Sequence, residues 1–178
     1  MTSSPVRILG IDPGSRVTGY GIVDSQNNRV SYVASGCIRV QGDDLAQRLC
    51  TIFHEVQNLV VDYHPHELAV ERVFMHRNAD SALKLGQARG AAICAAASRD
   101  IPVLEYTATQ IKQSVVGRGN AAKQQVQHMV RVLLNLSAEP QADAADALAA
   151  ALCHANTRKT LSHMEGIAGM SRGRFRHL

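Results

Sequence analysis

The stretch VRILGID at residues 6–12 is the segment from which the fold can be worked out. Its apolar residues predict a buried strand, and the Pro-Gly pair that follows turns the chain. Residues 18–24 and 29–39 are predicted to be two further strands, joined by a turn at 26–28. These three strands would form an antiparallel meander, with Asp12 at the carboxyl end of the first strand.

Beyond the meander, helices alternate with two short strands. The strands are predicted at 67–71 (ELAVE) and 102–106 (PVLEY). Helices are predicted at 43–63 with Asp43 or Asp44 as its cap, at 80–98, after a capping box formed by Thr107 and Gln110, at 121–135 and at 141–157.

This order of elements predicts an α/β fold with a mixed five-stranded sheet. The strand order is 3-2-1-4-5, because right-handed crossovers place the last two strands beside the first. Strand 2 is antiparallel, and helices cover both faces. We expect one domain over residues 1–157, followed by a basic, mobile tail over 158–178.

Four carboxylates are predicted to meet at one edge of this sheet. Asp12 and Glu71 end neighbouring parallel strands, at the edge where open α/β sheets bind ligands. Asp143 and Asp146 share one face of the last helix. Each acid alone has an ordinary explanation, namely a turn, a strand end or a helix dipole. At about 4 Å and an effective dielectric near 20, each pair of carboxylates repels by on the order of 4 kcal/mol. Protons or Mg²⁺ would relieve this repulsion. The pattern therefore predicts metal-assisted cleavage of a phosphodiester.

The distribution of charge favours a polyanionic partner. The formal net charge is +4, and residues 71–131 carry nine basic and four acidic side chains. Acidic sites beside basic stretches suit nucleic acid, although solvated surface is the alternative explanation. No apolar run is long enough to span a membrane, and the N-terminus MTSSPVR lacks a signal-peptide core, so we expect a cytoplasmic protein. Cys50, Cys94 and Cys153 are expected to be buried thiols.

Long motifs in a fixed order resemble the RuvC family of Holliday-junction resolvases, which has the ribonuclease H fold. They are GIDPGSRVTGYG (10–21), SGCI (35–38), ERVFMHRNADSALKLGQARGAA (71–92), QIKQSVVGRGNAAKQQVQHMV (110–130) and QADAADALAAALCHA (141–155).

The resemblance implies a reaction and the residues that perform it. The family's metal-binding catalytic acids match Asp12, Glu71, Asp143 and Asp146. Two Mg²⁺ ions roughly 4 Å apart, for which Mn²⁺ can substitute, would cut one phosphodiester in each of two opposing strands of a four-way DNA junction. The products would be nicked duplexes with 5′-phosphate ends, formed during recombination and DNA repair.

The resemblance also implies contacts with DNA. Phe74 matches an aromatic residue that the family places against unpaired bases, whereas the residues alone favour an ordinary core side chain. Lys112 and Lys123 match residues used on the DNA backbone. Arg77 and Arg118 are predicted contacts because they lie near these motifs.

Two cuts related by symmetry predict a two-fold homodimer, with the alanine-rich helix 80–98 as its interface. A RuvA–RuvB branch-migration motor is a partner implied by the resemblance alone. His154 lies about 12 Å along the last helix from Asp146, too far to bind the same ions.

Two other functions remain open at this point. A binder of branched DNA without catalytic activity would keep the shape but would not need the four acids. An actin-like ATPase also has an Asp-x-Gly after its first strand. It needs a second similar domain, however, for which 178 residues leave no room.

Overall fold

A computed structural model of the chain describes residues 4–72 and 79–174, with side chains described as far as Thr160. A five-stranded sheet in the order β3-β2-β1-β4-β5 forms its centre. The antiparallel pairs are β1–β2 and β2–β3, and the parallel pairs are β1–β4 and β4–β5. The strands are β1 (Val6–Asp12), β2 (Val17–Gln26), β3 (Arg29–Arg39), β4 (Glu67–Glu71) and β5 (Val103–Tyr106). The predicted strand order and directions are confirmed.

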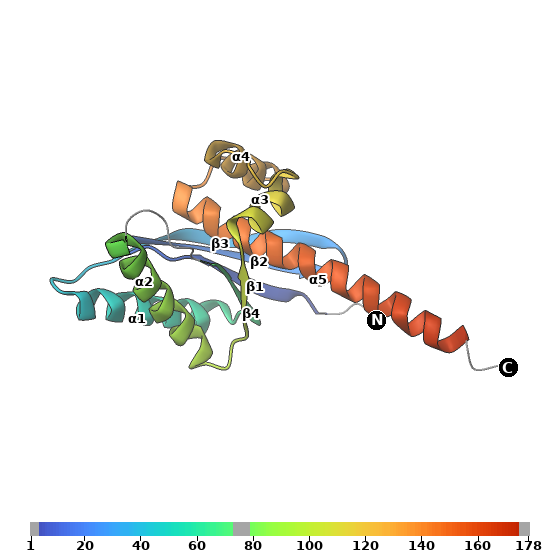
Figure 1. Ribbon diagram of the computed structural model, residues 1–178, viewed down its shortest axis with the longest axis horizontal. Helices are drawn as coiled ribbons and strands as arrows, with labels where there is room; N and C mark the ends of the chain where they lie inside the picture. Colours follow the sequence, from blue (N-terminus) through green and yellow to red (C-terminus); the bar gives the residue numbers. More distant parts are fainter. Residues whose placement is uncertain (1–3, 73–78, 175–178) are drawn as a thin grey trace.

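Helices cover both faces of the sheet (Figure 1). Alternation along β1 divides the core, since Leu9 and Ile11 pack with α1 and α2 while Ile8 packs with the other helices. The first face carries α1 (Leu45–Tyr63) and α2 (Ala79–Ala97), and the second carries α3 (Ala108–Val116), α4 (Lys123–Leu133) and α5 (Ala142–Arg174). Within the described part of the chain, none of these helices combines the length and the apolar character needed to cross a bilayer.

Local hydrogen bonds set where two of the helices begin. The side chain of Asp44 accepts a 2.8 Å bond from the backbone N–H of Gln47 and so caps α1. Thr107 and Gln110 form the predicted capping box at the start of α3, where the backbone N–H of each residue is bonded to the side chain of the other. Such caps satisfy backbone donors that the first turn leaves without partners.

The amino-terminal half of α5 lies directly on the backbone of β1 and β2. A Cβ atom at Gly10 would collide with the carbonyl oxygen of Ala147, and one at Gly19 would collide with the carbonyl of Asp143. Gly19 is the partner of Asp12 across the two strands. The two glycines therefore allow the start of α5, with its acids, to lie against the end of β1.

The structure corrects two predictions made from the sequence. The last helix does not end at residue 157 but continues to Arg174. Residues 158–174 lack both proline and an apolar stripe, and a helix that is already nucleated can propagate without one. Cys153 is buried as expected, whereas Cys50 and Cys94 are exposed, because they lie on the outer faces of α1 and α2.

Candidate active site

Asp12 and Glu71 lie side by side at the carboxyl edge of the sheet. The parallel register pairs Ile11 of β1 with Val70 of β4, so each acid is the next residue on its strand. Asp12, Glu71 and Asp146 line one cavity of about 320 Å³, together with Lys112 of α3 and Lys123 of α4. Three of the four predicted acids therefore share a cavity that also contains basic side chains.

The carboxylates act strongly on one another. Burial raises the pKa of Asp12 to about 7, and repulsion from Asp146, Glu71 and Asp143 contributes to the rise. Burial, followed by repulsion from Asp146, also raises the pKa of Glu71. Asp143 is not among the residues that line the cavity, yet it is close enough to destabilise the charged form of Asp12. A group in this environment gains a proton or a cation near neutral pH.

Lys123 supplies part of the missing positive charge. Its Nζ lies 3.1 Å from Oδ2 of Asp146, and this contact is the main reason why the pKa of Lys123 is raised. Among the residues that the structure describes, no three His, Cys, Asp or Glu side chains lie close enough together to hold a metal ion as they stand. The donor set still fits a hard cation, because it consists of carboxylate oxygens with an excess of negative charge.

An arginine that the sequence analysis overlooked holds the end of β4. Nε of Arg89 donates a 3.0 Å hydrogen bond to the backbone carbonyl of Glu71. Nη2 of Arg89 lies 2.8 Å from Oε2 of Glu105, which also pairs with Arg72 at 3.4 Å. These contacts tie the backbone at Glu71 to α2 and β5. The available signal was that Arg89 interrupts a run of small residues in α2.

A thiol also lies near the acids. Cys37 of β3 is the strand partner of Gly19, which in turn is the partner of Asp12. Burial, followed by repulsion from Asp143, raises the pKa of the Cys37 thiol. The thiol is therefore protonated at neutral pH, and a protonated thiol is a poor nucleophile.

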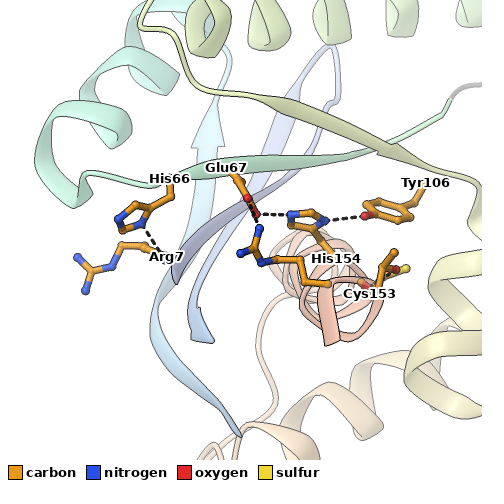
Figure 2. A network of polar contacts seen from close by, with 8 residues as sticks. Arg7, His66, Glu67, Tyr106, Cys153 and His154 are labelled. Carbon is orange, nitrogen blue, oxygen red and sulfur yellow. Dashed lines mark hydrogen bonds and ion pairs between the residues drawn. The ribbon is translucent and has the colours of Figure 1, made fainter. Parts of the chain in front are cut away.

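None of the histidines whose side chains the structure describes lines the cavity. His66 accepts a 2.9 Å hydrogen bond at Nδ1 from the backbone N–H of Arg7. His154 is buried between Tyr106 and Glu67, which are its hydrogen-bond partners (Figure 2). The expectation that His154 lies away from the acids agrees with these contacts.

The predicted DNA contacts fall into three groups. Lys112 and Lys123 line the cavity with the acids. Arg118 is exposed in the connection between α3 and α4 and does not line the cavity. Phe74 and Arg77 lie outside the described residues.

Carboxylates at the carboxyl edge of this sheet, with lysines beside them, define a nuclease with a ribonuclease H-like fold. Residues 8–154 match the family model described as "Crossover junction endodeoxyribonuclease RuvC". The RuvC protein of Shewanella loihica is 58% identical over 170 residues, which cover 95% of this chain and 98% of that protein.

Two solved structures from Thermus thermophilus agree with this match, and each covers 87% of this chain and 96% of the other. The RuvC structure has a TM-score of 0.79 at 32% identity. RuvC in complex with a Holliday junction substrate has a TM-score of 0.78 at 30% identity. The chain belongs to the RuvC family. Its activity is that of a crossover junction endodeoxyribonuclease, a metal-dependent hydrolase that resolves Holliday junctions in DNA recombination.

Proposed function

We propose that Asp12, Glu71, Asp143 and Asp146 hold two divalent ions, Mg²⁺ in the first instance, while this chain cuts a four-way junction. The pKa of Asp12, raised to about 7, carries the proposal. Burial and repulsion from the three other carboxylates cause this rise, and a bound cation would offset both. Oxygen ligands with a net negative charge are the environment that Mg²⁺ takes in proteins.

The position of each acid suggests its role. Asp12 is acted on by all three other carboxylates, so we assign it to both ions. Asp143 and Asp146 would hold the ion nearer α5, and Glu71 would hold the other. When bound, the ions supply an activated water and charge stabilisation for the leaving 3′ oxygen. None of the residues described as lining the cavity is Ser, Thr, Cys, His or Tyr, which favours direct hydrolysis over a covalent intermediate.

The protein's own cations would bind and orient the DNA. Lys112 and Lys123 line the cavity beside the acids, where they can pair with phosphates that flank the scissile bond. Arg118, exposed beyond them, would contact the backbone further from the cut. Phe74 belongs to the same proposal through the resemblance, and Arg77 belongs to it because it lies near the family motifs. The structure of the Thermus protein with a Holliday junction supports junction DNA as the substrate.

We propose that the active form is a homodimer that pairs through α2. The outer face of this helix contains Leu83, which is 62% exposed, and Cys94, which is exposed. Gly86 and Gly90 lie between them with open space above them. An apolar face with small residues at its centre allows two helices to approach closely. A two-fold axis between them would also relate the two cuts in opposing DNA strands. Cooperation with a RuvA–RuvB motor is part of the proposal by resemblance.

We further propose that residues 1–157 form the nuclease domain and that residues 158–178 are a basic extension. Glu67 and Arg158 form an ion pair across the boundary, so the first turn of the extension is attached to the sheet. The extension carries five basic residues and one acidic residue, a composition suited to DNA.

The test incubates the protein with a mobile four-way junction and Mg²⁺, beside the Asp12→Asn variant. We expect paired symmetric nicks from the wild type, and binding without cleavage from the variant. Asp100→Asn is a matched control, because Asp100 is exposed and has a positive φ of 58°, a conformation that Asn also tolerates. Nicking of linear duplex at an equal rate would contradict the assignment. Junction binding without cleavage by the wild type would favour the non-catalytic binder.

A further inference from the structure

Polar side chains centred on the buried His154 join β4, β5 and α5 (Figure 2). Nδ1 of His154 lies 2.6 Å from the hydroxyl oxygen of Tyr106, and its Nε2 lies 2.6 Å from Oε2 of Glu67. Arg158 pairs with the other carboxylate oxygen of Glu67. The side chain of His154 is only 6% exposed. We call Tyr106, His154 and Glu67 the polar clamp, which links β5, α5 and β4.

The clamp lies on the same stripe of α5 as one of the acids. Successive intervals of three or four residues connect Asp143, Ala147, Ala151, His154 and Arg158 along one side of the helix. The backbone at Ala147 and Ala151 contacts Gly10 of β1. This stripe therefore faces the sheet along its whole described length.

At the contact between these alanines and Gly10, backbone lies against backbone, so this contact by itself does little to fix the position of the helix along the strand. Helices are normally held in register by side-chain ridges that fit into grooves. Gly10 and Gly19 present no side chain to α5, which presents alanine at Gly10, whereas Leu148 of α5 places its side chain against Gly21. Apolar packing at Leu148 is not directional, and hydrogen bonds to a buried histidine can add the directional contacts that fix the register.

The geometry of β4 and α5 connects the clamp to the acids. β4 begins with Glu67 of the clamp and ends with Glu71, a span of about 13 Å at the usual rise of a strand. Asp146 and His154 are about 12 Å apart along α5. The two elements thus have nearly equal spans, with a clamp residue at one end and an acid at the other. Tyr106 is in turn the strand partner of Glu71.

We propose that His154 is a positioning residue that fixes the register of α5 on the sheet. It thereby sets where Asp143 and Asp146 stand relative to Asp12 and Glu71. His154 contacts none of the acids and acts only through the helix that carries two of them. Loss of the clamp lets α5 shift along the glycines, so the oxygen ligands no longer match a bound cation. The inference rests on the proposed metal site.

The test measures binding of Mn²⁺ to the full chain without DNA, by calorimetry or by electron paramagnetic resonance. Tyr106→Phe removes one hydroxyl from the clamp and keeps the ring, and His154→Leu removes the centre of the clamp. Ser114→Ala is the matched control, because it breaks a 3.1 Å hydrogen bond between α5 and α3 that does not involve the sheet. Circular dichroism checks that each variant is folded at the temperature used. If His154→Leu does not fold, the Mn²⁺ affinity of Tyr106→Phe decides the test.

We expect Tyr106→Phe and His154→Leu to bind Mn²⁺ roughly three- to tenfold more weakly than the wild type, within the range of coupling through a shared element. Ser114→Ala should bind like the wild type even if it melts earlier. Unchanged Mn²⁺ affinity in folded Tyr106→Phe, or an equal loss in Ser114→Ala, would overturn the positioning role and leave the metal site intact. A wild type that binds no Mn²⁺ would overturn both proposals.

Discussion

The ammonium of Lys123 lies 3.1 Å from Oδ2 of Asp146, which joins the first residue of α4 to an acid at the start of α5. Lys123 also acts on Asp12, where its positive charge opposes the rise in pKa. The lysine is therefore a partial internal counter-ion for the carboxylates. A divalent cation held by Asp146 would compete with it for the same oxygen.

This competition predicts that Lys123→Gln strengthens metal binding in the protein without DNA. The side chain of Lys123 is 77% exposed, so the pair is screened and the gain should be no more than about fivefold. Titration with Mn²⁺ measures it, and junction binding by the same variant should weaken. Lys84→Gln, which breaks a 2.7 Å ion pair with Asp80 on α2, is the control. Weaker Mn²⁺ binding by Lys123→Gln would mean that the lysine orients Asp146 for the metal.

The pKa of Asp12 predicts how the stability of the metal-free protein depends on pH. The group has a pKa of about 7 in the folded protein against 3.8 for an ordinary aspartate. Between these values the folded state binds more protons than the unfolded state, so the free energy of unfolding falls as the pH rises. At about 1.4 kcal/mol per pKa unit, the loss approaches roughly 4 kcal/mol at pH 8.

Asp12→Asn should remove this fall in the free energy of unfolding with rising pH. In urea denaturation with a chelator, the variant should exceed the wild type in stability at pH 8, and the advantage should shrink towards pH 4. Asp100→Asn, exposed and remote, should follow the wild type. An Asp12→Asn variant whose stability runs parallel to that of the wild type across this range would show that Asp12 is charged without penalty.

Gly10→Ala is predicted to push α5 away from β1. The new Cβ would overlap the carbonyl oxygen of Ala147 and lie 3.0 Å from the backbone nitrogen of Ala151, neither of which can rotate away. We expect a loss of about 1–3 kcal/mol or more in the free energy of unfolding, as is usual for overpacking, together with loss of cleavage. Gln124→Ala is the control, because Gln124 is exposed on α4, outside the proposed dimer face, and alanine is a strong helix former. Equal urea midpoints for the two variants would refute the close contact.

The exposed thiol of Cys94 provides a test of the proposed dimer. If two α2 helices pack around a two-fold axis that passes near Cys94, the Cys94 thiols of the two protomers come close together. A short bis-maleimide should then convert most of the protein to a covalent dimer, and Cys94→Ser should prevent this. Cys50→Ser, which removes another exposed thiol on α1, should still cross-link. A monomer in analytical ultracentrifugation at micromolar concentration, or cross-linking that depends on Cys50, would contradict an α2 interface.

Much of the fold was predictable because it depends on local pattern and general rules of topology. Apolar segments bounded by turns marked the strands, Thr107 and Gln110 marked a helix start, and right-handed crossovers fixed the strand order. The same rules put Asp12 and Glu71 on neighbouring strands. The length of the last helix was harder to predict, since α5 continues to Arg174 without any apolar stripe to indicate it.

The sequence by itself determined the sheet, the residues that end its strands and the supply of four acids, because periodicity and short-range capping encode them. Only the tertiary structure decided that Lys123 pairs with Asp146, that Arg89 holds the carbonyl of Glu71, and that His154 reaches Tyr106 and Glu67. The partners of His154 are 48 and 87 residues away along the chain. Contacts at such separations depend on how whole elements pack, and no local pattern of residues specifies them.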